Sequence, residues 1–446
     1  MSFPRYPAYK PSGVEWLGEV PEHWQEKPLK TITSINDEVL PESLSPDYEI
    51  EYVDIGSVSL ANGIEKTEAM PFGDAPARAR RIPRNGDVLV STIRTYLKAI
   101  APVVNPPLNL VASTGFAVVR PGHELEPGFL KYALQEEHFI QQVISRSTGV
   151  SYPAINASDV AKISLNLPGT SEQLAIVTFL DHETAKIDTL IAEQQRLIEL
   201  LQEKRQAVIS HAVTKGLNPD APMKDSGVEW LGEVPEHWDV KSCRNIASIG
   251  RGASPRPAGD SRYFGGDFIP WVTVAEITKD CSMWLCSTEQ YLTEEGAANS
   301  TVFSSGTVIY SNSGATLGVP KILKIDCCAN DGVVGFRGLD LSLKPEFLYH
   351  FLWQLTDSIR EWAKQGQGQP NLNTEIIKSI KIPLPPLEEQ VDILRKLDED
   401  LFVFDSLVSE ADKAQFLLGE RRSALISAAV TGQIDVRGLV PEVEAA

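Results

Sequence analysis

Thirteen residues, SGVEWLGEVPEHW, occupy Ser12–Trp24 and return unchanged at Ser226–Trp238, an offset of 214 positions. Farther along the chain the offset becomes 217, because EKRQAVISHAVT from Glu203 returns as ERRSALISAAVT from Glu420. Thirteen identities in a row do not arise by chance. Solenoid repeats are only about 20–50 residues long, so a period of this length indicates a duplicated pair of domains.

The two copies share their ends but not their interiors. Residues 30–145 barely resemble residues 244–362. Matching positions resume afterwards, for example at Glu172-Gln173, which returns as Glu389-Gln390. A shared frame around dissimilar interiors predicts two modules that perform one task on two different targets.

Each interior is predicted to be mixed α/β with Gly- and Pro-rich loops. One helix per half is expected, over Pro127–Arg146 and Pro345–Ala363, with Pro in the first turn of each. Helix N-caps are expected at Asn156 and Asn373, or at the neighbouring Ser158 and Thr374. Runs of β-branched and aromatic residues predict strands at Tyr52–Ile55, Val88–Thr92, Phe116–Val119, Ile163–Leu167, Ile269–Val272, Val308–Tyr310, Val333–Phe336 and Ile380–Pro383.

A long helix is predicted after Pro168 and again after Pro386. The first contains no Gly or Pro before Gly216, and apolar residues recur every seven positions in both. Four or more heptads favour a coiled coil, and the two helices are expected to pair antiparallel within the chain.

The predicted fold class is therefore α/β, with two globular domains joined by two coiled-coil helices. The expected divisions are residues 1–170 and 226–386 for the domains, with 171–225 and 387–446 for the helices, the linker and the tail. The heptad residues are Leu180, Ile187, Leu201 and Val208 in the first helix, and Leu397, Phe404, Ala411, Leu418 and Leu425 in the second.

The formal net charge of the 446 residues is −19, which opposes DNA binding because phosphate neutralisation dominates DNA affinity. Basic residues nevertheless outnumber acidic ones by six to one over Pro76–Lys98 and by four to one over Arg244–Phe264. Leu387–Arg422 holds ten acidic residues against five basic ones. An acidic frame with basic islands suits a protein that contacts DNA locally and partner proteins elsewhere.

The location is predicted to be cytoplasmic. The sequence has no run of eighteen apolar residues, and its first residues lack the apolar core of a signal peptide. Five cysteines without repeated spacing argue against a disulfide framework and favour a reducing compartment. Cys281 and Cys286 have no histidine nearby, so we expect no zinc site.

Catalytic motifs are weak. Asn105-Pro106-Pro107-Leu108 is similar to the Asn-Pro-Pro-aromatic motif with which adenine methyltransferases hold a flipped base, but Leu108 replaces the aromatic residue. A proline-rich turn is the simpler interpretation. His23 and His237 lie within the repeated Pro-Glu-His-Trp segment, where we expect packing rather than acid–base chemistry.

The candidate DNA contacts are basic, aromatic and polar residues that follow strands or close each module. Arg reaches guanine O6 and N7, Gln reaches adenine N6 and N7, and Gly lets the backbone approach phosphates. The candidates are Arg78, Arg80, Arg81, Arg94, Tyr96, Lys98, Arg146, Ser147 and Tyr152 in the first half, and Arg251, Ser254, Arg256, Arg262, Tyr263, Lys364, Gln365, Gln367 and Gln369 in the second.

Taken together, the sequence resembles the specificity subunits of type I restriction–modification enzymes over nearly its whole length. The resemblance rests on the repeated WLGEVPEHW segment, on LPPLEEQ from Leu384 with its weaker copy LPGTSEQ from Leu167, and on the variable–helix–variable–helix order. The copy that begins at Leu167 departs from the pattern, because Gly169-Thr170 stands where the copy from Leu384 has a proline and a leucine.

The resemblance implies a non-catalytic subunit that reads a split DNA target. It also implies two methyltransferase partners, which carry S-adenosylmethionine, and restriction partners that act as motor and nuclease; no cofactor is expected in this chain. Two other classes stay open from the residues alone: a stand-alone adenine-N6 DNA methyltransferase and a coiled-coil scaffold that does not bind DNA.

Overall fold

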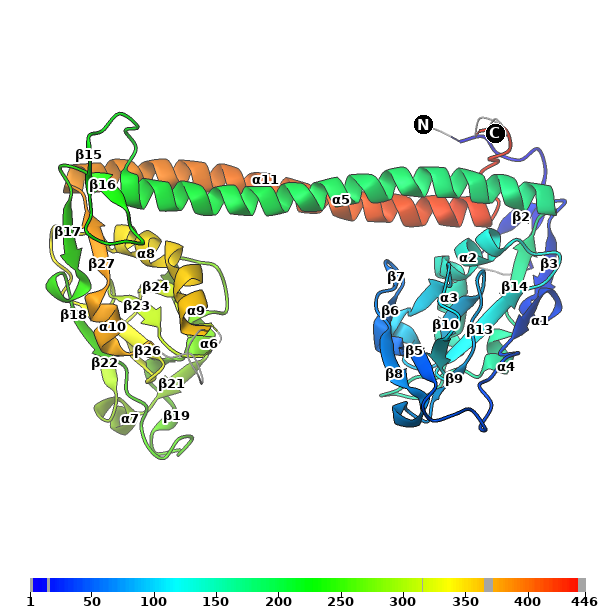
Figure 1. Ribbon diagram of the computed structural model, residues 1–446, viewed down its shortest axis with the longest axis horizontal. Helices are drawn as coiled ribbons and strands as arrows, with labels where there is room; N and C mark the ends of the chain where they lie inside the picture. The colour runs from blue at the N-terminus through cyan, green and yellow to red at the C-terminus, as the bar shows by residue number, and fades with distance from the viewer. Residues whose placement is uncertain (1–2, 14–16, 315, 365–371, 440–446) are drawn as a thin grey trace. The chain divides into compact units, whose positions relative to one another are not determined.

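The computed structural model describes residues 3–13, 17–314, 316–364 and 372–439. The chain forms two compact units, of which unit 1 combines two segments that are distant in sequence and unit 2 is one continuous segment (Figure 1). Unit 1 comprises the residues up to Gln195 and those from Asp412 onward, and unit 2 comprises Arg196–Ala411. The sequence put the divisions at the starts of the long helices. The contacts instead divide each helix near its middle, because each half packs on a different globular domain.

Two four-stranded sheets form the globular part of unit 1. The first is antiparallel with the order β11-β10-β13-β4, and comprises β4 (Thr33–Ile35), β10 (Val88–Ser91), β11 (Ile100–Pro102) and β13 (Phe116–Pro121). In the second, ordered β8-β5-β12-β9, β12 runs parallel to β5; it comprises β5 (Glu49–Val53), β8 (Glu68–Pro71), β9 (Ala79–Arg81) and β12 (Leu110–Ser113).

Shorter elements complete unit 1. Three strand pairs are β1 (Tyr9–Pro11) with β2 (Glu19–Pro21), β3 (Gln25–Pro28) with β14 (Ser164–Leu167), and β6 (Val58–Ser59) with β7 (Gly63–Ile64). The short helices are α1 (Leu29–Ile32), η1 (Ile55–Ser57), η2 (Phe72–Asp74), η3 (Thr95–Leu97) and α4 (Ala157–Val160).

Unit 2 repeats this topology. Its first sheet, ordered β18-β26-β23-β24-β20, comprises β18 (Ser248–Arg251), β20 (Trp284–Leu285), β23 (Val308–Ser311), β24 (Pro320–Leu323) and β26 (Val333–Arg337). Its second sheet, ordered β21-β19-β25-β22, comprises β19 (Phe264–Val272), β21 (Gln290–Leu292), β22 (Thr301–Phe303) and β25 (Cys327–Ala329), with β19 parallel to β25. Strand for strand, β23 corresponds to β10, β24 to β11 and β26 to β13. The mixed α/β fold and the internal repeat predicted from the sequence are confirmed.

The remaining elements of unit 2 are short. They are the strand pairs β15 (Met223–Asp225) with β16 (Glu233–Pro235) and β17 (Asp239–Ser242) with β27 (Lys381–Leu384), and the helices η4 (Cys243–Asn245), α6 (Val274–Ile277), α7 (Glu294–Ala298) and α10 (Thr374–Ser379). Asn373 caps α10 through the Ile376 N–H, as predicted, whereas Asn156 occupies the cap position of α4 without a capping hydrogen bond.

The prediction of one helix per interior was wrong, because two helices occupy each span. In unit 1 they are α2 (Pro127–Gln135) and α3 (Glu137–Ser145), and the Glu136 carboxylate between them accepts from the N–H groups of His138 and Phe139. This side-chain cap starts a new helix and ends the preceding one. In unit 2 the pair is α8 (Pro345–Gln354) and α9 (Thr356–Lys364).

The long helices α5 (Thr170–Lys215) and α11 (Leu387–Val430) contain 46 and 44 residues. Within unit 1 they run antiparallel, since Asp188 pairs with Arg422 and Gln195, farther along α5, bonds to Gln415. The heptad positions Leu180, Leu201, Leu397 and Ala411 are buried, as predicted.

The repeated opening segment fixes the start of one long helix in each unit. Trp24 Nε1 donates to Glu172 over 3.0 Å, and His23 Nε2 lies 2.7 Å from the same carboxylate. In unit 2 Trp238 and His237 make the same contacts with Glu389, at 3.0 and 2.8 Å. We call this arrangement the Trp–Glu clamp. The predicted packing role of the segment agrees with the full burial of Trp24 and Trp238, whereas the two histidines are about half exposed and hydrogen-bond the glutamates.

The neighbouring glutamine ties the long helix to the globular domain. In unit 1 the Gln173 amide accepts from the Glu126 N–H and donates to the carbonyls of Glu124 and Pro168. Gln390 makes the equivalent three bonds in unit 2. Because Gln173 and Gln390 are both fully buried, these bonds satisfy polar groups that water does not reach.

Candidate DNA interface

In unit 1 the turn after β10 and the loop after α3 lie side by side. Arg94 has a left-handed backbone, with φ of 51°, and its N–H donates to the Pro153 carbonyl over 2.7 Å. Its guanidinium carbon lies 4.8 Å from the centre of the Tyr152 ring. The hydroxyl oxygens of Thr95 and Ser147 are 2.8 Å apart. The fold thus brings two predicted segments together, and we call the candidates in them the Arg94 cluster: Arg94, Tyr96, Arg146, Ser147 and Tyr152.

The side chains of this cluster are accessible. Tyr96 and Tyr152 are 52% and 65% exposed, large values for aromatic residues on a folded domain. Arg146 is exposed at the end of α3 and donates to Gln142. Arginine stacked on tyrosine, with open faces on both, offers donors for phosphates or base edges and a surface for sugars.

Arg78 extends the same edge of the domain. Its Nε donates to the Tyr52 hydroxyl over 3.0 Å, and its carbonyl accepts from the N–H of Thr114. Next along the chain, Gly115 packs against Ile93; a Cβ on that glycine would lie 3.2 Å from the Ile93 side chain. A continuous edge therefore leads from Arg78 to Arg94.

Three further candidates of unit 1 are held within the domain by ring contact, burial or an ion pair. Arg80 lies over the Phe72 ring, 5.0 Å from its centre. Arg81 is half-buried with a buried Nε that has no hydrogen-bond partner, and burial lowers its pKa. Lys98 pairs with Glu137 at 2.9 Å. The structure does not bring these three into the Arg94 cluster.

In unit 2 the candidates gather around Asp331, in the turn between β25 and β26. Ser254 Oγ donates to this carboxylate over 2.7 Å, and Arg256 lies 3.7 Å from it. Arg251 Nε donates to the Asp331 carbonyl. The bond from Ser254 lowers the pKa of Asp331, and the charges of Arg251 and Arg256 lower it further. We call Arg251, Ser254, Arg256 and Asp331 the Asp331 cluster.

The rest of the same loop lines a cleft of about 750 Å³, together with Phe264, Trp271 and Tyr291. Arg262 is held by Asp260 at 2.8 Å, and its guanidinium carbon lies 5.2 Å from the centre of the Tyr263 ring. Arg256 is 72% exposed, more than Arg262, which is 60% exposed.

The polar segment that closes unit 2 falls largely outside the described residues. Gln365, Gln367 and Gln369 lie in 365–371, and of Lys364 only its place at the end of α9 is described. Under the 217-residue offset, segment 365–371 corresponds to 148–154, which contains Tyr152 of the Arg94 cluster.

Sequence reasoning missed the turn after β23, the counterpart of the Arg94 turn. Asn312 donates its N–H to Gly332, as Thr92 does to Gly115 at the equivalent place in unit 1. An added Cβ on Gly332 would lie 2.8 Å from Ser313 Oγ, so Ser313 occupies the position of Ile93. The 217 offset between Gly115 and Gly332 is the signal that would have found it.

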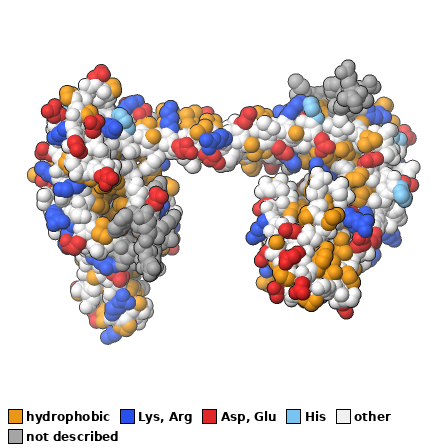
Figure 2. Space-filling view, viewed as in Figure 1, with side chains coloured by type: hydrophobic (Ala, Val, Ile, Leu, Met, Phe, Trp, Pro, Cys, Tyr) orange, Lys and Arg blue, Asp and Glu red, His pale blue; other side chains and the backbone are white. Residues whose placement is uncertain are grey.

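The basic islands are less cationic in the fold than in the sequence. Of the first island, Arg84 pairs with Glu38 at 2.7 Å and Arg78 lies 3.9 Å from Asp54, and both of these acids lie outside the island. Figure 2 shows acidic and basic side chains interspersed on the visible face of each unit.

The other motifs have structural explanations. The Asn105–Leu108 segment is an exposed loop in which the Asn105 N–H bonds to Asn85 and Leu108 is fully exposed. The five cysteines are free. Across the described part of the chain, no His, Cys, Asp and Glu side chains group in a way that could hold a metal ion, and no helix is long and apolar enough to span a membrane.

Comparison with known proteins identifies related chains. Residues 21–201 and 235–401 match the family described as type I restriction modification DNA specificity domain. Over 453 residues the chain is 23% identical to the MjaX specificity subunit of Methanocaldococcus jannaschii, covering 94% of this chain and 96% of that one. It is 21% identical to the EcoKI specificity subunit of Escherichia coli K12, covering 94% and 90%.

Solved structures give the same result. A chain from a study of complex assembly and conformational transition of the type I R-M system matches with a TM-score of 0.73 and 25% identity, over 93% of this chain and 99% of that one. The HsdS subunit from Thermoanaerobacter tengcongensis, at 24% identity and a TM-score of 0.52, shares the fold. With a matched domain in each half, the chain belongs to the type I restriction–modification DNA specificity family.

Proposed function

We propose that each unit reads one half of a split duplex DNA target, and that the chain docks methyltransferase and restriction subunits without catalysing a reaction itself. The observation that carries the proposal is the contrast between a shared strand order and different exposed edges. Unit 1 presents the Arg94 cluster, and unit 2 presents the Asp331 cluster. Two similar scaffolds that carry different hydrogen-bond donors suit the two different halves of a split DNA target.

Exposed apolar residues on the long helices support partner docking. Leu190 and Leu200 are 44% and 45% exposed, and their repeat equivalents Leu407 and Leu417 are 41% and 55% exposed. Each unit thus exposes one leucine of this set on α5 and one on α11, and exposed apolar side chains can mark interaction surfaces. Two equivalent surfaces fit two copies of one partner, which in this proposal is the methyltransferase that carries S-adenosylmethionine.

The decisive experiment replaces one interior. Residues 30–145 are exchanged for the corresponding segment of a related specificity subunit, and the chain is expressed with its methyltransferase. Methylated adenines mapped genome-wide should show one changed half-site and one unchanged half-site. The matched control replaces residues 244–362 and should change the other half. If either exchange changed both half-sites, the proposal that each unit reads one half-site would be refuted.

We also propose that the long helices set the unread gap between the half-sites. One heptad added after Gln194 and another after Ala411 lengthens both helices by about 10.5 Å, or about three base pairs of DNA. Adding only one heptad should mainly destabilise the chain, because apolar residues lose their partners. The double insertion also rotates the half-sites by about a third of a turn, so activity can fall. A folded, active double insertion with the original gap would contradict the proposal.

A further inference from the structure

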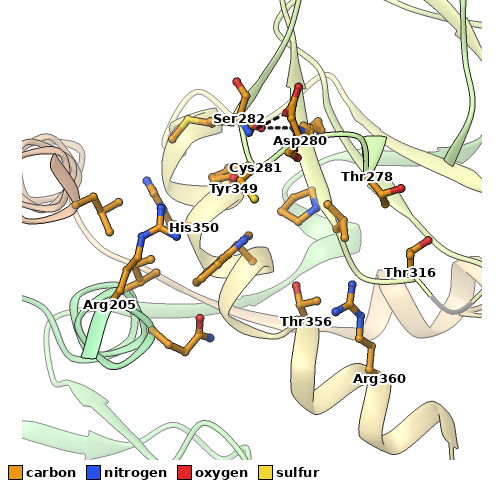
Figure 3. Close-up of a pocket in the computed structure, with 18 residues that line it drawn as sticks. Arg205, Thr278, Asp280, Cys281, Ser282, Thr316, Tyr349, His350, Thr356 and Arg360 are labelled. Carbon is orange, nitrogen blue, oxygen red and sulfur yellow. Dashed lines mark hydrogen bonds and ion pairs between the residues drawn. The ribbon is translucent and has the colours of Figure 1, made fainter. Parts of the chain in front are cut away.

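One cavity distinguishes the two units more sharply than any other feature. In unit 2 it has a volume of about 420 Å³ and lies between the two long helices, the end of α8 and the Thr278–Met283 segment (Figure 3). The equivalent space in unit 1 lies between the long helices, the end of α2 and the loop Leu60–Asn62, which joins β6 to β7. Small-molecule sites commonly fall in the range of about 300–1,000 Å³.

A substitution at the repeat equivalent of Tyr132 leaves polar groups unsatisfied in unit 2. The Tyr132 hydroxyl donates to Asp181 over 2.6 Å and lies 3.2 Å from the Thr184 hydroxyl. Because α2 begins at Pro127 and α8 at Pro345, His350 takes the place of Tyr132. The shorter His350 ring is 3% exposed, and neither of its nitrogens has a hydrogen-bond partner.

The partner position has changed as well. Leu401 stands at the repeat equivalent of Thr184, and it lines the cavity beside His350. An apolar side chain there offers no hydrogen bond to the imidazole. A buried polar group without a partner costs about 1–3 kcal/mol, so the space next to His350 favours a bound group that supplies the missing bonds.

The two cavities also have opposite charge. The described residues that line the unit 2 cavity include three cations, Arg205, Lys321 and Arg360, and one carboxylate, Asp280. Those of unit 1 include three carboxylates and one arginine: Glu136, Glu137, Asp188 and Arg422. The lining of the unit 2 cavity is therefore the more cationic of the two.

The cations of unit 2 differ in how far they are already engaged. Lys321 is tied to Asp280 at 2.5 Å. The buried Nε of Arg205 lies 3.7 Å from the Asp405 carboxylate, which is too far for a hydrogen bond, and it has no hydrogen-bond partner. In Figure 3 Arg205 and His350 lie next to each other on one side of the cavity, across from Thr356 and Arg360.

Aromatic side chains complete the lining. Trp353 and Tyr349 both face the cavity, and the Arg205 guanidinium carbon lies 5.6 Å from the centre of the Trp353 ring. A flat ring can stack on such residues, while an oxyanion accepts from Arg205 and a hydroxyl bonds to the neutral imidazole. Burial keeps His350 neutral at physiological pH by lowering its pKa to about 4, so it offers one donor and one acceptor.

We propose that the unit 2 cavity is a binding site for a small aromatic oxyanion of the size of a nucleoside monophosphate, held by Arg205 and His350. The ligand brings an anion to Arg205, a hydroxyl to His350 and a planar ring to Trp353. This site is separate from the Arg94 and Asp331 clusters, and it does not depend on the proposed reading of DNA.

The test measures binding of AMP by calorimetry to the full chain in complex with its methyltransferase. Adenosine and inorganic phosphate are measured alongside. AMP should bind, and each fragment should bind at least about tenfold more weakly, because each makes only part of the contacts. Binding of inorganic phosphate as tight as that of AMP would refute the aromatic part of the proposal. No binding of AMP to this chain at millimolar concentration would overturn the proposal.

Two variants of this chain separate its cavity from sites on the partner. Arg205→Met keeps the apolar stem but removes the charge, and AMP affinity should fall about tenfold or more. The double variant His350→Tyr with Leu401→Thr recreates the unit 1 arrangement, so it should fold and lose AMP binding. Asn62→Ala, on the unit 1 cavity, is the matched control and should bind normally. AMP binding that survives in both unit 2 variants would assign it to the methyltransferase and overturn the proposal.

Discussion

Unit 1 and unit 2 share the same strand order apart from the added edge strand β20 of unit 2, yet their exposed arginines come from different places. In unit 1 Arg94 follows β10 and stacks on Tyr152. In unit 2 the equivalent turn after β23 carries Asn312 and Ser313, and the arginines come from the loop between β18 and β19 instead. The comparison shows that the strand order sets the position of the exposed edge of each unit, whereas the loop sequences set which side chains that edge exposes.

The shared segments around the interiors show the opposite, because they make the same contacts in both units. The Trp–Glu clamp is repeated with matching partners and with distances that agree within 0.1 Å, although the interiors that it supports differ. The two copies differ in the carboxylate oxygens used, since Trp24 and His23 contact different oxygens of Glu172 whereas Trp238 and His237 share one oxygen of Glu389, and they differ in burial. The Glu172 side chain is 8% exposed, and that of Glu389 is 27% exposed.

The largest effect is expected from removing the clamp. Glu172→Ala leaves the fully buried Trp24 N–H without an acceptor, and should lower the free energy of unfolding by about 3 kcal/mol. Glu389→Ala should cost less, about 2 kcal/mol, because water reaches that site more readily. Urea unfolding of each variant measures both values, and Glu172→Gln is the conservative control. Equal losses would show that burial does not separate the two clamps.

A comparable effect is expected from pH, and only in unit 2. The pKa of His350 in the folded chain is about 4, below the ordinary value of 6.5. Above pH 6.5 the imidazole is neutral in both states, and stability is unaffected. As the pH falls below 6.5, the unfolded chain gains a proton that the folded chain does not accept until about pH 4, so stability decreases.

The expected loss from this group is about 2 kcal/mol at pH 5. The difference in unfolding free energy between the wild type and His350→Phe, measured at pH 7 and at pH 5, isolates it from the carboxylates. Tyr132→Phe is the matched control in unit 1, where burial raises the pKa of the tyrosine, so that the phenol itself stays neutral from pH 5 to pH 7. A wild type that is no more acid-sensitive than His350→Phe would contradict the prediction.

Smaller effects are expected on DNA. Arg94→Ala and Arg256→Ala should each weaken binding of the methyltransferase complex by about 1–3 kcal/mol if the arginine contacts a base edge, and should relax one motif position. If it contacts phosphate, affinity should fall for all sequences and the salt slope should decrease by about one. Lys98→Ala, which removes a lysine already paired with Glu137, should change little. Unchanged affinity and motif for both arginine variants would assign them to the solvated surface.

The smallest effect concerns two ion pairs at equivalent places between the long helices. Asp188 and Arg422 are 2.8 Å apart, whereas Asp405 and Arg205 are 3.7 Å apart. A double-mutant cycle on the first pair should give a coupling of about 0.5 kcal/mol, and on the second about zero. A stronger coupling in unit 2 would mean that Arg205 is held by Asp405 and is not available to the cavity.

Periodic and repeated features of this protein could be predicted from the sequence. The strands Val88–Ser91 and Phe116–Pro121 and the heptads of both long helices follow from the spacing of apolar residues. The break between α2 and α3 could not be predicted, because the Glu136 cap is a local side-chain bond without a periodic signal. The ion-pair partners of the arginines could not be predicted either, because Asp331 lies 75 residues beyond Arg256 in the sequence and the two residues meet only in the folded chain.

The repeated clamp also bears on heredity. Since the supports at Glu172 and Glu389 are alike, an interior that fits one frame fits the other. Stretches that encode the same thirteen residues twice give recombination two places to cross over. Under the proposed function, a lineage that exchanged an interior at these borders would acquire a new half-site in one step and would keep the frame that docks its partners. The interior can therefore diversify as a cassette, and the frame sets the limits of each exchange.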